Sequence, residues 1–257
     1  MRVADMGIKM AVFDLDGTLL RTDKTISERT KTALHLCQNK GIKTAYATGR
    51  GSSAAIIVPP GLFDGKITMN GSVARAGNKI VYNSLIPCLT ARPFLLACDK
   101  RGLKMTSELT GMHYTNFTIP DDWTDVVRNW EITDFSKHDK DAEKICTSDL
   151  TTEDIAFITD NLPANLYMVM AADGLAMIMH NDATKAKAVA ALANHWEIAQ
   201  SEIIAFGDDL NDIDLLEFAE VSVAMGNALD NVKAVANHIC DTNDNDGAAK
   251  WMEENLL

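Results

Sequence analysis

Two carboxylates, Asp14 and Asp16, stand two residues apart directly after the apolar run Met10–Phe13. In an extended backbone, residues i and i+2 face the same side, so both acids are directed to one edge of a sheet. Gly17 then allows the chain to turn sharply. Such a pair can bind a hard cation, while one carboxylate attacks as a nucleophile and the other transfers protons. The full string Asp-x-Asp-Gly-Thr after a hydrophobic strand is a much more specific signal for this chemistry than Asp-x-Asp alone.

Two further apolar runs also end abruptly in polar residues. Residues 45–47 lead into Thr-Gly-Arg at 48–50, and residues 203–206 lead into Gly-Asp-Asp-Leu-Asn-Asp at 207–212. Short apolar runs of this kind are typical of buried parallel strands. In open α/β sheets, ligands bind beyond the carboxyl ends of the strands. We therefore expect the three polar segments to meet at one rim of a single sheet.

A regular alternation of elements would bring these segments to the same rim. Residues 8–14 and 42–48 are expected as strands, and residues 27–40 as a helix that Ser27 caps and Gly41 ends. This strand–helix–strand unit implies a parallel pair with a right-handed crossover. The expected fold class is therefore α/β, with a doubly wound parallel-sheet (Rossmann-like) core domain. Further core elements are predicted as strands at 67–70, 72–76, 79–82, 203–206 and 221–224 and helices at 185–196, 212–218, 229–238 and 247–255.

The stretch 84–182 differs from the rest because hairpins and helices mix there. Such a mixture indicates an inserted α+β domain with an antiparallel sheet. We expect a core domain of residues 1–83 and 183–257 and an inserted domain of residues 84–182. Inserted helices are predicted at 90–101, 122–130 and 152–161, and strands at 103–108, 112–117, 144–147, 166–172 and 175–180, the last two joined across the turn Asp173-Gly174.

Composition narrows the possible partners. The net charge of -12 and the pI near 4.9 argue against non-specific nucleic-acid binding, which needs a basic surface. No apolar run approaches the length of a membrane span, and the first six residues lack the apolar centre of a signal peptide. The five scattered cysteines show no metal-ligand spacing, which indicates reduced thiols and a cytoplasmic location.

The motifs, in this order, resemble the haloacid dehalogenase-like superfamily of phosphotransferases, and most closely its Cof-type sugar-phosphatase branch. Residues 14–18 look like the first motif, residues 48–50 the second, Lys185 the third and residues 207–212 the fourth. In this branch the Thr-Gly-Arg is followed by an Asn-Gly segment, here within 69–71, and then by a large inserted cap. The chain departs from the family pattern after the lysine, where Ala replaces Gly, and after Arg50, where Pro-Pro-Gly at 59–61 shortens a connection that is usually helical.

The resemblance implies a phosphomonoesterase that works through an aspartyl-phosphate intermediate. Asp14 would be the nucleophile, and Asp16 would protonate the leaving group and then activate water. The implied cofactor is Mg²⁺, which takes one or two carboxylates together with waters and a phosphate oxygen. The resemblance places Asp14, the backbone carbonyl of Asp16 and the side chain of Asp208 on the metal. Asp212 would hydrogen-bond a metal-bound water.

The resemblance also implies a phosphate pocket. Thr48 would donate its hydroxyl group, Gly49 its backbone N–H, and Lys185 its positive charge to the transferring phosphoryl group. Asn211 would either touch the phosphate or fix the loop. Arg50 and Asn70 are equally compatible with substrate binding and with local structural contacts. Asp209 is interpreted as a loop acid, and Lys187, 200° around the helix from Lys185, is expected to face solvent.

The expected substrates are small phosphorylated metabolites, with sugar phosphates favoured, and a closing cap would exclude water. Two alternatives stay open: a phosphomutase with the same aspartyl-phosphate, and a non-catalytic ligand-binding relative. In the cap, one strand directs Met168 and Met170 to a common face, and its hairpin partner does the same with Met177 and Met179. This Met face either lines an adaptable substrate pocket or fills a core. His113 and His180 are open to the same two interpretations.

Overall fold

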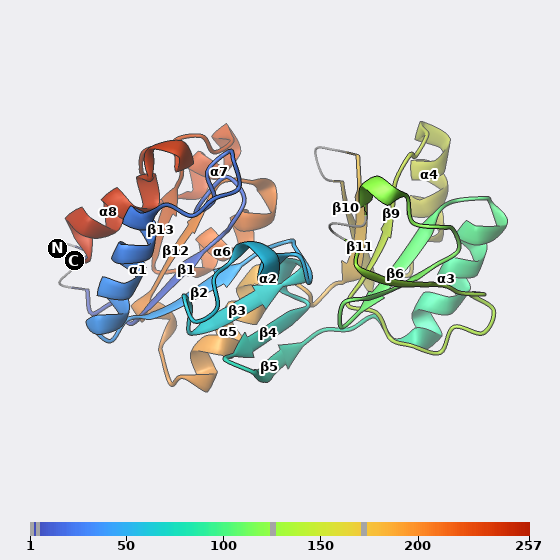
Figure 1. Cartoon of the computed structure of the whole chain (residues 1–257), viewed down its shortest axis with the longest axis horizontal. Helices are drawn as coiled ribbons and strands as arrows, with labels where there is room; N and C mark the ends of the chain where they lie inside the picture. The colour runs from blue at the N-terminus through green and yellow to red at the C-terminus, as the bar shows by residue number, and fades with distance from the viewer. Residues whose placement is uncertain (1–2, 4–5, 124–126, 171–173) are drawn as a thin grey trace. The chain divides into compact units, whose positions relative to one another are not determined.

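The computed structural model describes residues 1–257 except 1–2, 4–5, 124–126 and 171–173. The chain divides into two units, each with its own β-sheet (Figure 1). Unit 1 consists of Met1–Asn83 and Thr184–Leu257, and unit 2 consists of Ser84–Ala183. Within the described residues, no helix combines the length and the apolar character that crossing a membrane requires.

Unit 1 contains an eight-stranded sheet in the order β14-β13-β12-β1-β2-β3-β4-β5. The neighbours from β14 to β3 pair in parallel, whereas β4 pairs with β3 and β5 in antiparallel fashion. A mostly parallel sheet of this order is the expected α/β core. The strands are β1 (Met10–Phe13), β2 (Lys43–Ala47), β3 (Gly65–Thr68), β4 (Val73–Ala76), β5 (Lys79–Asn83), β12 (Ile203–Gly207), β13 (Val221–Ala224) and β14 (His238–Ile239).

The register of β1 aligns the ends of three strands. Phe13, the last residue of β1, lies beside Phe206 of β12 and Tyr46 of β2. All four residues of β1 are fully buried, because neighbouring strands flank it on both edges and helices cover its faces. The polar residues that follow these strands therefore begin at the same level of the sheet.

Helices cover both faces of this sheet. On one face, α1 (Glu28–Asn39) and α8 (Gly247–Asn255) lie side by side (Figure 1), linked by an ion pair between Arg29 and Glu253, and Trp251 of α8 packs on Phe206. On the other face, α5 packs so closely on β3 that a Cβ atom on Gly65 would lie 2.7 Å from the Leu192 side chain. The remaining helices of unit 1 are α2 (Ala54–Ile57), α5 (Lys185–His195), α6 (Ile213–Phe218) and α7 (Asp230–Val235).

The predicted α1 is confirmed in detail. Ser27 accepts a hydrogen bond from the backbone N–H of Thr30, and the helix buries Ala33, Leu34 and Cys37 on one face. The helix predicted at 229–238 is wrong at its end. It stops at Val235, and His238–Ile239 instead pair in parallel with β13 as the edge strand β14.

Unit 2 contains a six-stranded sheet in the order β10-β11-β9-β6-β7-β8. All neighbours pair in antiparallel fashion except β7 and β8, which are parallel. Helices α3 and α4 share a hydrophobic core with the sheet, to which Leu95, Ile145, Ile158 and Ile178 contribute. The elements are α3 (Cys88–Lys100), β6 (Met105–Leu109), β7 (Met112–Thr115), β8 (Asn129–Ile132), β9 (Lys144–Thr147), α4 (Thr152–Asn161), β10 (Leu166–Met170) and β11 (Ala176–His180).

Two predictions for unit 2 need correction. The helix expected at 122–130 is absent from the described part of that range, where a short 3₁₀ turn at Asp121–Trp123 is followed by the strand β8. Residues 124–126 lie outside the described residues, as does Asp173 of the predicted Asp173-Gly174 turn. The second correction concerns the Met face, because Met168 pairs with Ile178, and Val169 pairs with Met177.

This register places the predicted Met residues on opposite faces of the sheet. Paired residues of an antiparallel sheet share a face, so Met168 and Met170 lie on the face of Ile178, whereas Met177 and Met179 lie on the other. Met168 packs against the core that α3 and α4 form with the sheet. A single Met face therefore does not exist, and only Met177 and Met179 lie opposite the helices.

Candidate active site

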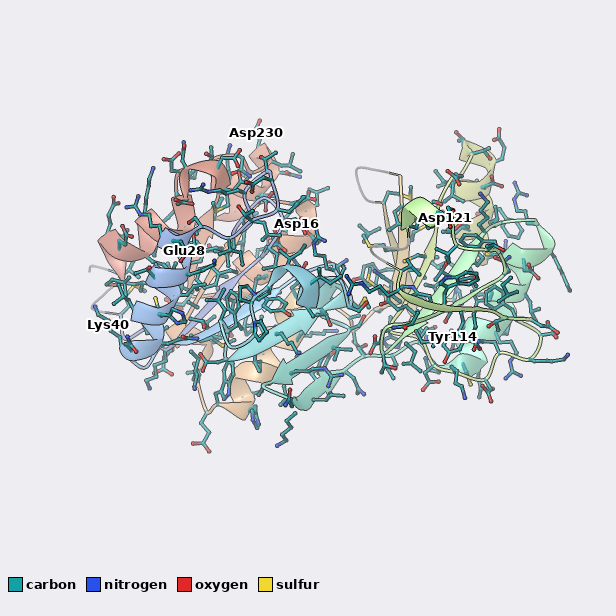
Figure 2. The ribbon with its side chains drawn as sticks, in the orientation of Figure 1. Asp16, Glu28, Lys40, Tyr114, Asp121 and Asp230 are labelled. Carbon is teal, nitrogen blue, oxygen red and sulfur yellow. The ribbon has the colours of Figure 1, made fainter. Side chains whose placement is uncertain are left out.

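The two carboxylates of the first motif follow β1 and have different surroundings. The backbone N–H of Asp14 continues the strand pairing by donating to the Phe206 carbonyl at 3.0 Å, and the Asp14 side chain is buried. Asp16 is more accessible, with its side chain 37% exposed. In Figure 2, Asp16 lies nearer to Glu28, where α1 begins, than to Lys40, which follows the end of that helix. This position is expected for a loop beyond the carboxyl end of β1.

Lys185 connects the first and fourth motifs. It is the first residue of α5, and Thr184 caps that helix by accepting a hydrogen bond from the backbone N–H of Lys187. The Lys185 Nζ atom lies 2.6 Å from Asp14 Oδ1 and 2.5 Å from Asp212 Oδ1, and its side chain is fully buried. Lys187, two residues later, is exposed. The structure therefore brings Lys185, and not Lys187, to the expected nucleophile.

Burial and neighbouring charges together shift the pKa values of Asp14 and Lys185. Burial raises the pKa of Asp14 well above its usual value, and the nearby Asp212 and Asp208 raise it further, whereas the Lys185 ammonium opposes the rise. Burial alone would lower the pKa of Lys185, but Asp14 and Asp212 more than compensate, so its pKa is raised. Lys185 therefore stays charged, and its charge favours the ionised form of Asp14.

The fourth motif forms a loop organised by Asp212. Asp212 Oδ2 accepts the backbone N–H groups of Asp208 at 2.9 Å and Asp209 at 3.1 Å, while its Oδ1 accepts Lys185. Gly207 is required here, because a Cβ atom on it would lie 2.6 Å from the Asp212 Cβ. Asp209 bonds only locally among the described contacts, accepting the backbone N–H of Leu210 at 2.7 Å. The structure thus gives Asp212 direct contacts with the loop and with Lys185, and its link to a metal-bound water stays a prediction.

Three acids gather where a cation would be held. One carboxylate oxygen each from Asp14, Asp208 and Asp212 lies within 4.8 Å of the others. Asp208 also accepts the Thr18 hydroxyl at 2.7 Å, and burial raises the pKa of Asp208 to about 7. Lys185 supplies a single positive charge against these three acids, of which Asp14 and Asp212 are buried and Asp208 is half-buried. Hard oxygen donors with surplus negative charge fit Mg²⁺, which would favour the ionised form of each acid.

Gly17 lets Asp208 approach the first motif. Its φ of +78° is left-handed, and a Cβ atom there would lie 2.2 Å from Asp208 Oδ2. Glycine is thus needed both for the turn after Asp16 and for the close contact with the fourth motif.

The second motif lies next to Asp16. Thr48 is buried, and its Oγ1 accepts the backbone N–H of Arg50 at 3.1 Å. The Arg50 guanidinium donates to both carboxylate oxygens of Asp16, at 2.5 and 2.7 Å, and Lys24 Nζ lies 2.9 Å from Asp16 Oδ1. Burial raises the pKa of Asp16, but the hydrogen bonds from Arg50 and Lys24 outweigh it, so the pKa is lowered. Lys24 is a contact that the sequence analysis missed, since no motif points to it.

Asn70 and Gly71 join three motifs. Asn70 is buried with a left-handed φ of 52°, and its Oδ1 accepts the Asn211 side-chain amide at 2.9 Å. A Cβ atom on Gly49 would lie 3.0 Å from Asn70 Oδ1. A Cβ atom on Gly71, with φ +101°, would lie 2.1 Å from the carbonyl oxygen of Thr184. This Asn-Gly turn therefore packs against the second motif, the fourth motif and the start of α5.

The two histidines singled out by sequence lie in unit 2. His180 Nδ1 lies 3.2 Å from Ser84 Oγ. His113 is buried, with Nε2 3.6 Å from Glu108 Oε1, and burial together with the nearby Lys144 lowers its pKa to about 4. His113 is therefore neutral at physiological pH.

Comparison with known proteins agrees with this geometry. A family model for haloacid dehalogenase-like hydrolases matches residues 11–252, nearly the whole chain. The chain belongs to the haloacid dehalogenase-like (HAD-like) hydrolase family. This HAD-like hydrolase is 30% identical, over an alignment of 266 residues covering 98% of both chains, to the 5-amino-6-(5-phospho-D-ribitylamino)uracil phosphatase YcsE of Bacillus subtilis. It is 26% identical to a second phosphatase of the same description from that organism, YitU, with 95% of this chain and 96% of the relative covered.

Solved structures give the same result. A HAD-superfamily phosphatase from Bacteroides thetaiotaomicron is similar with a TM-score of 0.84 and 26% identity, covering 98% of this HAD-like hydrolase and 97% of the solved chain. A HAD subclass IIB sugar phosphatase, BT4131, is similar with a TM-score of 0.81 and 27% identity, covering 96% and 98%. The predicted family, its Cof-type branch, the α/β fold class and the phosphatase class of enzyme are thereby confirmed. The roles of individual residues stay predictions.

Proposed function

We propose that the protein is a Mg²⁺-dependent phosphomonoesterase that works through an aspartyl-phosphate on Asp14. The contact between Lys185 and Asp14 carries this proposal. A carboxylate that attacks an anionic phosphate needs a fixed positive charge at the point of attack, and Lys185 Nζ lies 2.6 Å from the Asp14 carboxylate in a fully buried position. Mg²⁺, held by Asp14, Asp208 and the backbone carbonyl of Asp16, would neutralise further phosphoryl charge.

In the first step, an oxygen of Asp14 forms a bond to phosphorus while the bond between phosphorus and the leaving oxygen breaks. The Asp16 carboxyl group gives its proton to that leaving oxygen. In the second step, water attacks phosphorus, Asp16 takes up a proton of the water, and the bond from phosphorus to Asp14 breaks. Thr48, Gly49 and Lys185 donate to the phosphoryl oxygens in both steps.

The proposed substrates are small phosphorylated metabolites, with sugar or polyol monophosphates as the favoured class. The names of YcsE and of BT4131 support this class, because one describes a phosphorylated ribityl chain and the other a sugar phosphatase. We further propose that unit 2 acts as the cap of the family and selects the leaving group. A cytoplasmic location is supported by the free thiols of all five cysteines.

The test is a panel of sugar, polyol and nucleoside monophosphates, assayed for release of inorganic phosphate with Mg²⁺ and with excess EDTA. We expect Mg²⁺-dependent release from several esters, and loss of that release in Asp14→Asn, whose amide is near-isosteric but a poor nucleophile. Interconversion of phosphate isomers without phosphate release would instead identify a phosphomutase. A complete lack of turnover by a folded, Mg²⁺-supplied protein would favour a non-catalytic ligand-binding relative.

A further inference from the structure

The carboxylate of Asp16 is held by two cations from two different loops. Arg50 donates from Nε to Oδ2 at 2.5 Å and from Nη2 to Oδ1 at 2.7 Å, and Lys24 adds a contact to Oδ1 at 2.9 Å. The side chain of Arg50 is 24% exposed, whereas that of Lys24 is 55% exposed. A two-point, partly buried bond is stronger and more directional than a single exposed one, so Arg50 is the principal partner of Asp16.

Arg50 is itself fixed through its backbone. Its N–H donates to Thr48 Oγ1 at 3.1 Å, and its carbonyl accepts the backbone N–H of Met69 at 3.0 Å. Asp16, in contrast, lies in a loop that turns at Gly17, outside any helix or strand. The orientation of the Asp16 carboxylate therefore depends on a side chain supplied by the second motif.

A planar guanidinium that bonds both oxygens of a carboxylate fixes its plane as well as its position. Proton transfer needs this kind of control, because the carboxyl oxygen must come within hydrogen-bond reach of the leaving oxygen and later of the attacking water. Displacing a reacting group by about 1 Å can cost about a hundredfold in rate.

We propose that Arg50 is a positioning residue for proton transfer by Asp16. The inference rests on the proposed phosphatase function. Asp16 gives a proton to the leaving oxygen in the first step and takes one up from water in the second. Between these transfers Asp16 is ionised, and the two hydrogen bonds from the Arg50 guanidinium (the Arg50 fork) hold this ionised form in place. Arg50 thus affects ester cleavage through Asp16 and not through a contact of its own with the phosphate.

This role predicts a dependence on the leaving group. Alkyl phosphates, such as sugar monophosphates, leave as strongly basic alkoxides and need the proton. The 4-nitrophenolate of 4-nitrophenyl phosphate is stable without it. We expect Arg50→Gln to lower kcat/KM for the best sugar monophosphate of the panel by about tenfold or more, and kcat/KM for 4-nitrophenyl phosphate by less than about threefold. A residue that binds the phosphate directly would lower both values equally.

A double-mutant cycle with Asp16→Asn decides between these roles. If Arg50 acts through Asp16, adding Arg50→Gln to Asp16→Asn should lower kcat/KM for the sugar monophosphate by less than about threefold further. Lys24→Gln is the matched control, since it removes a cation from the same carboxylate but only one exposed bond, and should cost less than about threefold. Arg50→Lys keeps the charge without the fork and should restore only part of the loss. Thermal unfolding of each variant checks that it is folded.

The positioning role would be overturned by equal losses of kcat/KM on the two esters, or by an undiminished effect of Arg50→Gln in the Asp16→Asn background. Neither result would contradict the proposed phosphatase function as long as the wild type turns over both esters. An increase in kcat/KM for the sugar monophosphate in Arg50→Gln would also overturn it, because Arg50 would then restrain Asp16 rather than aim it. Absence of turnover by the wild type on both esters would refute the phosphatase function and this role with it.

Discussion

We expect the free energy of unfolding of the metal-free protein to fall as the pH rises, and the ionisation of Asp208 to be the main cause. Burial raises the pKa of Asp208 from its ordinary 3.8 to about 7 in the metal-free fold. The unfolded chain releases this proton near pH 4, whereas the metal-free folded chain holds it until about pH 7. The folded state therefore binds the extra proton between these values, and its stability declines as the pH rises through that window.

The size of the effect follows from the shift. Each pKa unit corresponds to 1.36 kcal/mol, so a shift of roughly three units removes up to about 4 kcal/mol between pH 4 and pH 8. For a chain of this size, 1 kcal/mol changes Tm by about 2–4 °C, which gives a change on the order of 10 °C. Burial raises the pKa of Asp14 too, so its contribution has the same sign.

Thermal unfolding of EDTA-treated wild type and Asp208→Asn over pH 4–8 measures this effect. The amide can still accept the Thr18 hydroxyl that Asp208 accepts at 2.7 Å, so the two proteins should unfold at similar temperatures near pH 4. The variant should become the more stable of the two as the pH rises. Mg²⁺ should raise the Tm of the wild type at pH 8 and leave that of the variant nearly unchanged. A Tm difference that does not vary with pH, or equal stabilisation of both proteins by Mg²⁺, would refute this account of the acidic cluster.

Three further outcomes follow from contacts described above. Lys185→Met should lower kcat/KM by about a hundredfold through the loss of about 3 kcal/mol of transition-state stabilisation, whereas Lys187→Met should change it by less than about threefold; steady-state kinetics showing the reverse would move the third motif by two residues. Gly17→Ala should abolish the response of Tm to Mg²⁺, because the added methyl group would occupy the space of the Asp208 carboxylate, and an unchanged response would show that the loop adapts. Met168→Ala should lower the stability of unit 2 by about 1–3 kcal/mol without reordering substrates, while Met177→Ala should reorder them in the phosphate-ester panel; the opposite pattern would contradict the assignment of the two sheet faces.

The sequence predicted those parts of the site whose positions follow from where a buried strand ends. Asp14 and Asp208 each follow a buried strand, and parallel pairing places the ends of β1 and β12 at the same level, so their meeting could be predicted. The fork between Arg50 and Asp16 could not. It depends on the side-chain directions of two loops, and neither loop has a periodicity from which such a direction can be read.

The errors in unit 2 have physical causes of the same kind. A two-residue turn at Asp173-Gly174 would pair Met168 with Met179, but the observed register differs by one residue and pairs Met168 with Ile178. A slip of one residue exchanges the two faces of a strand. β8 is only four residues long, and its alternation of Asn, Trp, Glu and Ile is too brief to identify a strand without its partner β7.

The split of unit 1 into two chain segments has a consequence for the order of folding. Lys185 and Asp14 are 171 residues apart in the chain, and Thr18 and Asp208 are 190 apart. Closing a flexible loop of that length costs about 4–5 kcal/mol of chain entropy. Unit 2 is continuous, so it can fold during synthesis before β12 has been made, and its ends are then already close, with Ser84 Oγ 3.2 Å from His180 Nδ1. We therefore expect unit 2 to fold first and to shorten the effective loop, so that the proposed catalytic residues come together in the last stage of folding.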